Sequence, residues 1–328
     1  MPTIKDIAKA AGVSKATVSN VFNNKSCVKS TTRERVLAEA ERIGFHPSHL
    51  AKSLATKRTN IAGYFLETHK EELVRKTDAD MLLPILSELK RYGIKLLCYY
   101  ESWNTPVAFD AEPIDFAFIF APVIDDKRLE GAGELHHKKL IVIGRPSIQN
   151  DFIRWVDVNT EEMTRKVTQQ LIELGHQHIL FINSEAHITI SQDRTQGYQA
   201  ALAEANIAFD DRLVIYAGLT AEAGCRSICD VLSQEIQFDA VIASSDEVAS
   251  GVYEALREAQ LLIPEDVSVY ALGGDDYNLF PKLCNVATDY WALGKEAVRL
   301  AISDSCENHT ILDAYSMVHG ASIKDRRN

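Results

Sequence analysis

Hydrophobic runs of strand length alternate with amphipathic helical patterns along most of the chain. The hydrophobic runs lie at 61–66, 94–100, 115–121, 139–144, 178–183, 213–217, 238–243 and 267–272. They are continuous, which is typical of strands that are covered on both faces. Helical periodicity lies between many of them, near 78–92, 159–174, 193–206, 221–235, 245–259 and 290–304. This order predicts an α/β body of doubly wound parallel sheets, and because eight strands are many for one such sheet, we expect two lobes.

The first 58 residues show helical periodicity only. Helical segments are expected over 4–11, 14–22, 30–43 and 49–55. Thr3 and Asp6 are spaced as a capping box at the start of the first segment, and Ser14 can cap the second. Gly12 lies in the turn between them, where a positive φ is tolerated. Two helices joined in this way predict a helix-turn-helix module, and a three-helix module for protein contacts is the alternative.

Charge separates the same segment from the rest of the chain. Residues 1–58 contain eleven Lys and Arg and four acidic residues, a net charge of +7, whereas the remainder carries −18. A small basic segment attached to a large acidic one favours a polyanion as its partner. Together with the helix-turn-helix spacing, the charge indicates a DNA-binding head. Its second helix would present Lys15, Ala16, Thr17 and Asn20 to base edges and phosphates.

Other features of the composition exclude several classes of protein. No apolar run reaches the roughly 18 to 20 residues of a membrane-spanning helix, and the first residues lack an apolar signal core. Six scattered cysteines without a CxxC pair fit a reduced cytoplasmic protein better than a disulfide framework or a zinc module. The chain has no Walker, GxGxxG or GxSxG element. We therefore expect no catalytic residues, no metal and no cofactor.

Several segments together resemble the lactose/galactose repressor family. TIKDIAKAAGVSKATVSNVFNN is similar to the opening pattern of the family, and HPSHLAKSLATKRT resembles its hinge. LIELGHQHILFIN, DRTQGYQAAL, SSDEVASGVYEAL, IPEDVSV and ALGKEAVRLA follow in family order. The resemblance implies a three-helix helix-turn-helix head with a hinge helix, and a two-lobed body like that of periplasmic binding proteins. The expected boundaries are 1–46 for the head, 47–59 for the hinge and linker, and 60–328 for the body, with lobe 1 at 60–157 plus 288–310 and lobe 2 at 158–287 plus 311–328.

The resemblance also implies how the head contacts DNA. Lys15 and Ala16 stand where the family reads the major groove, and Asn20 replaces a common arginine and could read an adenine edge. Leu54 matches the hinge leucine that the family wedges into the minor groove, although it could pack against the body when no DNA is bound. The expected DNA contacts are Thr3, Ser14, Lys15, Ala16, Thr17, Ser19, Asn20, Asn23, Lys29, Leu54 and Lys57.

Polar residues that follow the predicted strands are the candidates for a ligand site, because open α/β sheets bind ligands at the carboxyl ends of their strands. Arg194 is expected to open a helix and matches the R-x-x-G-[YF] element of the family, whose arginine commonly grips effector hydroxyls or a carboxylate. Either Gly273-Gly274 or Asp275-Asp276 occupies the acidic positions of the family, and we choose Asp275. The expected effector contacts are Arg194, Asp275, Ser245, Asp246, Tyr290, Leu219, Glu67 and Arg145.

These features favour a ligand-responsive transcription regulator over two alternatives. A periplasmic sugar-binding protein would carry a signal peptide and no basic head, and a nucleotide-using α/β enzyme would need a phosphate-binding or catalytic motif. We expect a cytoplasmic repressor, not bound to a membrane, that acts as a homodimer on a near-palindromic double-stranded DNA operator. A small-molecule effector between the lobes, a sugar or sugar derivative, would change its operator affinity.

Overall fold

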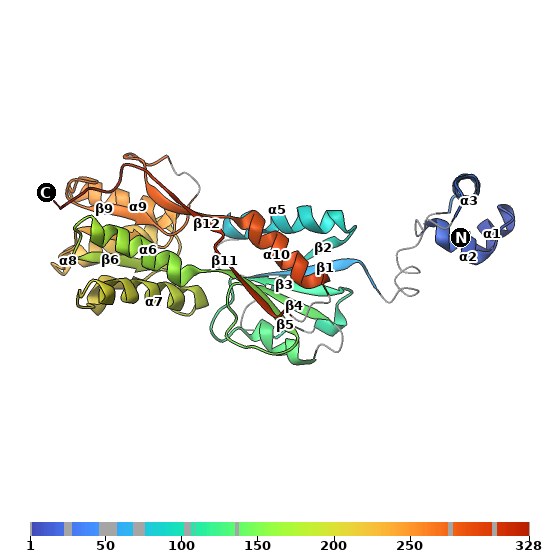
Figure 1. The fold of residues 1–328 in the computed structure, drawn as a ribbon, viewed down its shortest axis with the longest axis horizontal. Helices are drawn as coiled ribbons and strands as arrows, with labels where there is room; N and C mark the ends of the chain where they lie inside the picture. The colour runs from blue at the N-terminus through green and yellow to red at the C-terminus, as the bar shows by residue number, and fades with distance from the viewer. Residues whose placement is uncertain are drawn as a thin grey trace. The chain divides into compact units, whose positions relative to one another are not determined.

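The computed structural model describes residues 2–22, 28–45, 58–67, 76–101, 106–107, 109–134, 138–274, 278–303 and 307–327. The chain forms two compact units, Met1–Asn60 and Ile61–Asn328 (Figure 1). Each unit has its own hydrophobic core.

The described part of the first unit consists of helices packed around small aliphatic side chains. The helices are α1 (Ile4–Ala10), α2 (Lys15–Phe22) and α3 (Ser30–Arg42). Ile7, Val18, Val21 and Val36 are each at most 1% exposed and form the centre of this core. Gly12 takes a φ of +61° in the turn between α1 and α2, where a glycine is favoured. The predicted helix-turn-helix is confirmed, while the helix expected at 49–55 lies outside the described residues.

Lobe 1 of the second unit is built on a parallel sheet of six strands in the order β11-β5-β4-β3-β1-β2. The strands are β1 (Ile61–Glu67), β2 (Lys95–Glu101), β3 (Phe116–Phe120), β4 (Lys139–Ile143), β5 (Ile153–Val158) and β11 (His309–Leu312). Helices α5 (Lys76–Arg91) and α10 (Tyr290–Ile302) cover one face, and the 3-10 helices η1 (Phe109–Ala111) and η2 (Lys127–Glu134) contribute to the core on the other.

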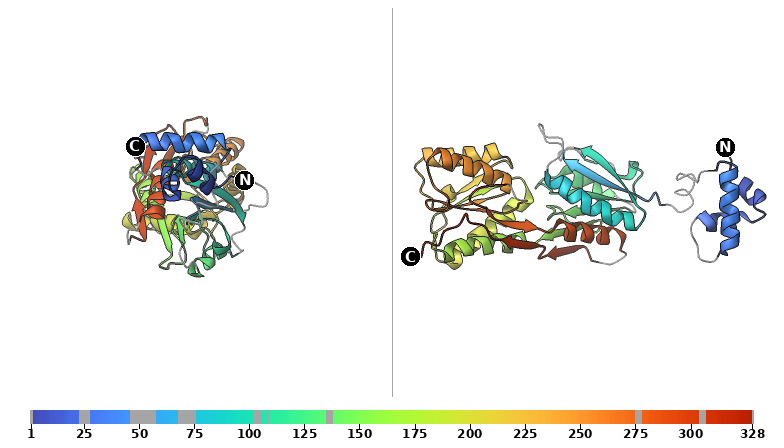
Figure 2. Two further views of the ribbon diagram at one scale, coloured as in Figure 1. Left: turned by 90° about the vertical axis from the view of Figure 1, so that its right-hand side faces the viewer. Right: turned by 90° about the horizontal axis from the view of Figure 1, so that it is seen from above.

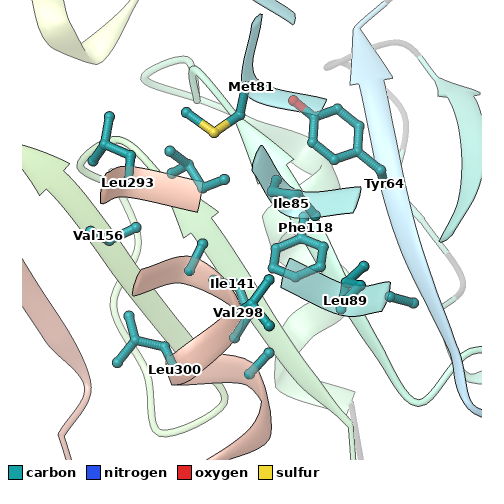
Figure 3. Close-up of a cluster of buried hydrophobic side chains, with 14 of the residues drawn as sticks. Tyr64, Met81, Ile85, Leu89, Phe118, Ile141, Val156, Leu293, Val298 and Leu300 are labelled. Atoms are coloured by element: carbon teal, nitrogen blue, oxygen red, sulfur yellow. The ribbon is translucent and has the colours of Figure 1, made fainter. Parts of the chain in front are cut away.

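The main core of lobe 1 lies between its two α-helices and the sheet (Figure 3). Ile85 and Leu89 of α5 and Val298 of α10 pack against Phe118 and Ile141 of the sheet, and all five side chains are fully buried. Burying an aliphatic or aromatic side chain of this size stabilises a fold by about 1.5–3 kcal/mol. This core fixes the strands whose carboxyl ends form one wall of the site described below.

Lobe 2 has a second six-stranded sheet in the order β12-β10-β9-β8-β6-β7, in which only β12 runs antiparallel to its neighbour. The strands are β6 (Ile179–Asn183), β7 (Val214–Tyr216), β8 (Ala240–Ala243), β9 (Ser268–Ala271), β10 (Cys284–Thr288) and β12 (Tyr315–Val318). Helices α6 (Thr160–Glu173) and α7 (Thr189–Glu204) cover one face, and α8 (Ala221–Ser233) and α9 (Asp246–Glu258) the other (Figure 2). The 3-10 helix η3 (Asp211–Leu213) precedes β7.

The chain passes between the lobes at three described places. These lie between β5 and α6, between β10 and α10, and between β11 and β12. The predicted two-lobed α/β body of doubly wound parallel sheets is therefore confirmed. All eight predicted strands are present, and β5, β10, β11 and β12 are additions that the hydrophobic pattern did not predict.

Candidate functional site

The second helix of the head presents an exposed, capped start. The Thr17 backbone N–H donates to Ser14 Oγ at 3.1 Å, which confirms Ser14 as the cap of α2. Lys15 and Ala16, the first residues of this helix, are exposed, as is Lys29 directly before α3. The exposed N-terminal part of a second helix is what a helix-turn-helix inserts into the major groove.

The other expected DNA contacts have more varied surroundings. Ser19 and Asn20 are half-buried on α2. The backbone N–H and the hydroxyl of Thr3 both donate to Asp6 Oδ2, at 2.8 and 2.7 Å, and these bonds lower the pKa of Asp6. Thr3 and Asp6 thus make the contacts that the capping-box spacing predicts. Asn23, Leu54 and Lys57 lie outside the described residues.

A cavity of about 490 Å³ lies in the body and is lined by both lobes. From lobe 1, Pro122 follows β3, Gly144 follows β4, and Asp157 lies at the end of β5. Lobe 2 contributes Ser184 and Ser244, which follow β6 and β8. The cavity therefore occupies the carboxyl ends of both parallel sheets, where folds of this type bind ligands.

Most of the expected effector contacts come together at this cavity. It is lined by Arg194, Ser245, Asp246, Tyr290 and Leu219. Arg145 follows a lining residue but is not itself part of the described wall. Glu67 ends β1 and its side chain is not described, and Asp275 lies outside the described residues.

The Arg194 guanidinium is buried in lobe 2. Its Nη1 donates to Ser184 Oγ at 3.3 Å and its Nη2 to the Leu272 carbonyl at 3.2 Å. Its Nε has no hydrogen-bond partner among the described residues. Burial lowers the pKa of Arg194 to about 10, and the fields of Tyr290 and Asp157 oppose this shift. The group is therefore charged at neutral pH, and these bonds engage two of its five N–H donors, so donors remain for a ligand.

The expectation that Arg194 opens a helix is wrong. Helix α7 begins at Thr189, so Arg194 lies in its second turn. The polar segment before Arg194 is held in place by tertiary contacts that its local pattern does not reveal. The backbone N–H and the hydroxyl of Thr189 both donate to the Pro122 carbonyl of lobe 1, at 3.3 and 3.1 Å, and Ser191 Oγ donates to the Glu185 carbonyl at 2.8 Å.

The start of α9 supplies a second group of polar atoms to the cavity. Ser245 Oγ accepts the Val248 N–H at 3.2 Å and so caps the helix, and Asp246 Oδ1 accepts the Glu247 N–H at 3.0 Å. Ser244 Oγ is buried and has no hydrogen-bond partner among the described residues. An unpartnered buried hydroxyl costs free energy, so Ser244 is placed to bond a ligand.

Asp157 is a cavity residue that was not among the expected contacts. It is the second-last residue of β5, and its Oδ1 accepts the Val158 N–H at 2.8 Å. Burial raises the pKa of Asp157 to about 7; the Val158 bond opposes this shift, Asp193 adds to it and Arg145 opposes it. Its position at the carboxyl end of a strand could have identified it, but the strand itself was not predicted.

The two lobes also contact each other at the rim of the cavity. Arg145 Nη1 of lobe 1 lies 3.0 Å from Asp193 Oδ1 of α7 in lobe 2. Nearby, the Ile124 N–H donates to the His187 carbonyl at 2.8 Å, beside the Thr189 contact described above. Arg145 therefore joins the lobes instead of lining the cavity.

The described parts of the chain contain no cluster of three or more His, Cys, Asp or Glu residues suited to a metal ion. They also contain no helix that is long and apolar enough to cross a membrane.

Comparison with known proteins identifies relatives of both units. Residues 3–48 match the model of bacterial regulatory proteins of the lacI family, and residues 168–323 match a periplasmic binding protein-like domain. The HTH-type transcriptional regulator AscG of Escherichia coli (strain K12) is 30% identical over 298 residues, which cover 86% of this chain and 84% of AscG.

Two solved structures share the fold over nearly the whole chain. The complex of the transcriptional regulator CelR with cellobiose has a TM-score of 0.72 at 24% identity, covering 98% of this chain and 100% of that one. The Lac repressor dimer bound to operator and the anti-inducer ONPF has a TM-score of 0.82 at 22% identity, covering 98% and 99%.

Proposed function

Because this chain belongs to the lacI family of bacterial regulatory proteins, we propose that it is a repressor whose operator affinity is changed by a small carbohydrate bound between its lobes. The chain is a DNA-binding transcription regulator with an effector-binding domain, and not an enzyme. The observation that carries the proposal is the cavity between the lobes, where Arg194 Nε and Ser244 Oγ lack partners among the described residues.

The proposed mechanism couples two sites in one chain. Residues 1–46 bind the operator, residues 47–59 form the hinge and linker, and residues 60–328 bind the effector. Within the last of these, lobe 1 comprises about 60–157 and 288–310, and lobe 2 the remainder; strands β5, β10 and β11 cross these bounds by one or two residues. An effector that contacts both lobes stabilises one relative orientation of the lobes over another, and this differential affinity is what changes operator binding.

The DNA-bound form that we propose is a cytoplasmic homodimer on a near-palindromic operator. Helix-turn-helix heads bind successive half-sites in pairs, and the Lac repressor relative is a dimer bound to operator. Lys15 and Ala16 would read the major groove, and Leu54 would enter the minor groove between the half-sites.

A thermal-shift screen of the full chain against sugars and nucleobases tests the effector class. We expect a sugar to raise the melting temperature, and the same sugar to change the affinity for an operator selected from random duplex DNA, measured by fluorescence anisotropy. Arg194→Ala is the control and should remove the thermal shift. A ligand that stabilises Arg194→Ala as strongly as the parent chain, or a response to nucleobases alone, would contradict the proposal.

A further inference from the structure

The charges on the cavity wall are unevenly distributed. Its described residues include the carboxylates of Asp157, Glu185, Asp246 and Glu247 and a single cationic side chain, Arg194. Two of the five N–H donors of Arg194 are already bonded within lobe 2. A phosphate or carboxylate bound beside Arg194 would therefore meet one positive charge and four acidic residues of the described wall. Binding of anions at built sites relies on the opposite balance, an excess of positive charge.

Asp157 is the acidic residue that lobe 1 contributes to the described wall, and Arg194 of lobe 2 lines the same cavity. The charge of Asp157 acts on the Arg194 guanidinium and opposes the lowering of its pKa. The charged groups that act on Asp157 are Arg145 after β4 and Asp193 on α7. Arg194 and Tyr290 of α10 line the same cavity.

Arg145 does not fully neutralise Asp157, because its guanidinium is engaged with Asp193 at 3.0 Å. The raised pKa of Asp157 indicates that its carboxylate is poorly compensated inside the cavity. A ligand that donates hydrogen bonds to this carboxylate would relieve that cost, whereas an anionic ligand would increase it.

We propose that Asp157 determines effector specificity: it accepts hydrogen bonds from hydroxyl or amino groups of an uncharged or amine-bearing sugar held by Arg194, and it excludes phosphorylated sugars. This inference rests on the proposed function, since it assigns the effector class to the same cavity. The inference concerns whether the sugar is charged. Arg194 alone does not decide this, because an arginine can bind sugar hydroxyls as well as anionic groups.

Calorimetric titration of the full chain with matched sugars at pH 8, where the Asp157 carboxyl is ionised, tests the proposal. The probes are glucose, glucosamine and glucose 6-phosphate, ribose and ribose 5-phosphate, and cellobiose and cellobiose 6-phosphate. In the parent chain we expect binding only from uncharged or amine-bearing probes. Asp157→Asn should weaken that binding about tenfold to a hundredfold, as loss of a hydrogen bond to a charged group does. The variant should also lower the ratio of the Kd for a phosphorylated sugar to the Kd for its unphosphorylated partner by at least about tenfold. A general loss of stability does not produce such a change in selectivity.

Two variants separate the possible failures. Asp211→Asn removes an exposed carboxylate outside the cavity, and it should change neither the sugar affinity nor the ratio of the two Kd values. Arg194→Ala identifies binding that uses the cavity. If a phosphorylated probe binds the parent chain more tightly than its unphosphorylated partner and loses that binding in Arg194→Ala, the cavity is an effector site but the inference is overturned. Equal sugar affinity in the parent chain and in Asp157→Asn also overturns it. If no probe binds the parent chain, the carbohydrate function itself fails, and the specificity assignment with it.

Discussion

Arg145 and Asp193 meet across the boundary between the two lobes, with Arg145 Nη1 3.0 Å from Asp193 Oδ1. The Asp193 side chain is only 6% exposed, whereas that of Arg145 is 43% exposed. Burial raises the pKa of Asp193, and the guanidinium of Arg145 opposes that shift. The pair therefore exists only while the lobes are in the arrangement seen here, and its strength contributes to the stability of that arrangement.

Removing either partner of this ion pair should weaken effector binding to a similar extent. Because one partner is largely solvated, we expect only about 0.5–1 kcal/mol, a two- to fivefold increase in Kd, for Arg145→Ala and for Asp193→Asn. The double variant should be no weaker than either single one, since the two residues act through one contact. Calorimetry with the tightest-binding sugar measures the cycle, and additive effects would show that the residues act separately.

Arg194→Ala should abolish the response to the effector and leave operator binding intact. Arg194→Lys should not restore the response, because a lysine ammonium cannot bond Ser184, the Leu272 carbonyl and a ligand in the geometry of a planar guanidinium. We expect a tenfold to hundredfold loss of sugar affinity, about 1.5–3 kcal/mol. Operator affinity measured with and without sugar checks this. A lysine variant that responds normally would contradict the role of the guanidinium fork.

Asp157→Asn should change how stability depends on pH. The pKa of Asp157 is about 7 in the folded chain, against about 3.9 for an ordinary aspartate. Between these values the folded chain holds a proton that the unfolded chain has lost, so stability falls as the pH rises from about 4 to 7 and then levels off. In the parent chain this loss can reach about 1.4 kcal/mol per pH unit. The variant does not undergo it, so the stability of the variant minus that of the parent chain should be larger at pH 8 than at pH 5. Urea unfolding of the ligand-free chains at the two pH values measures the difference, and an equal difference at both would indicate an ordinary carboxyl.

Operator binding should depend steeply on salt concentration, because residues 1–58 contain eleven basic and four acidic residues. Lys15→Ala should change the preferred operator sequence, since Lys15 is exposed at the start of α2. Lys57→Ala should instead lower the salt slope by about one while preserving sequence preference. Anisotropy titrations at several salt concentrations distinguish the two effects. An affinity that is flat between low and moderate salt would contradict phosphate neutralisation.

Gly251→Ala should destabilise lobe 2 because α8 and α9 approach closely at this residue. A Cβ at Gly251 would lie 1.7 Å from the Ala221 carbonyl oxygen and 2.8 Å from the Cys225 nitrogen, so backbone would have to move. We expect a loss of at least about 1–3 kcal/mol in the free energy of unfolding. Gly218→Ala is the control, because its Cβ would meet the Ala223 Cβ at an ordinary 3.7 Å. Equal stability of both variants would show that the helix pair can adjust.

The sequence predicts the strands with continuous hydrophobic runs and fails for those that contain polar residues. Strand β5 carries Arg154 and Asp157, so its pattern does not look buried. Arg154 is nevertheless accommodated because its Nη1 donates to the Leu300 and Ser303 carbonyls at 2.7 and 3.0 Å. These acceptors are nearly 150 residues away along the chain, so the sequence around Arg154 does not indicate that they are present. Strands β11 and β12 are short edge strands whose existence depends on partners formed much earlier in the chain.

The same limit explains which site residues were predicted. Arg194 could be found because it follows a recognisable strand and matches a family element, although the start of its helix depends on the contact between Thr189 and Pro122. Asp157 was missed together with β5. Arg145 was expected to contact the effector, and its ion pair with Asp193 depends on how two separate lobes face one another. Its role in effector binding remains a prediction, as do the contacts assigned to Asp275 and Glu67.

The order of the elements along the chain has a consequence for synthesis on the ribosome. Helix α10 packs on α5 in lobe 1, β11 then completes the sheet of lobe 1, and β12 completes that of lobe 2. Neither lobe is therefore a continuous stretch of nascent polypeptide, and lobe 1 cannot complete its sheet until β11 (His309–Leu312) has been translated, after all but the last strand of lobe 2. A premature stop codon ahead of α10 would remove one helix of lobe 1 and an edge strand of each sheet. The truncated chains should therefore be recognised as unfolded and degraded, so that they do not persist as DNA-binding heads joined to a folded lobe.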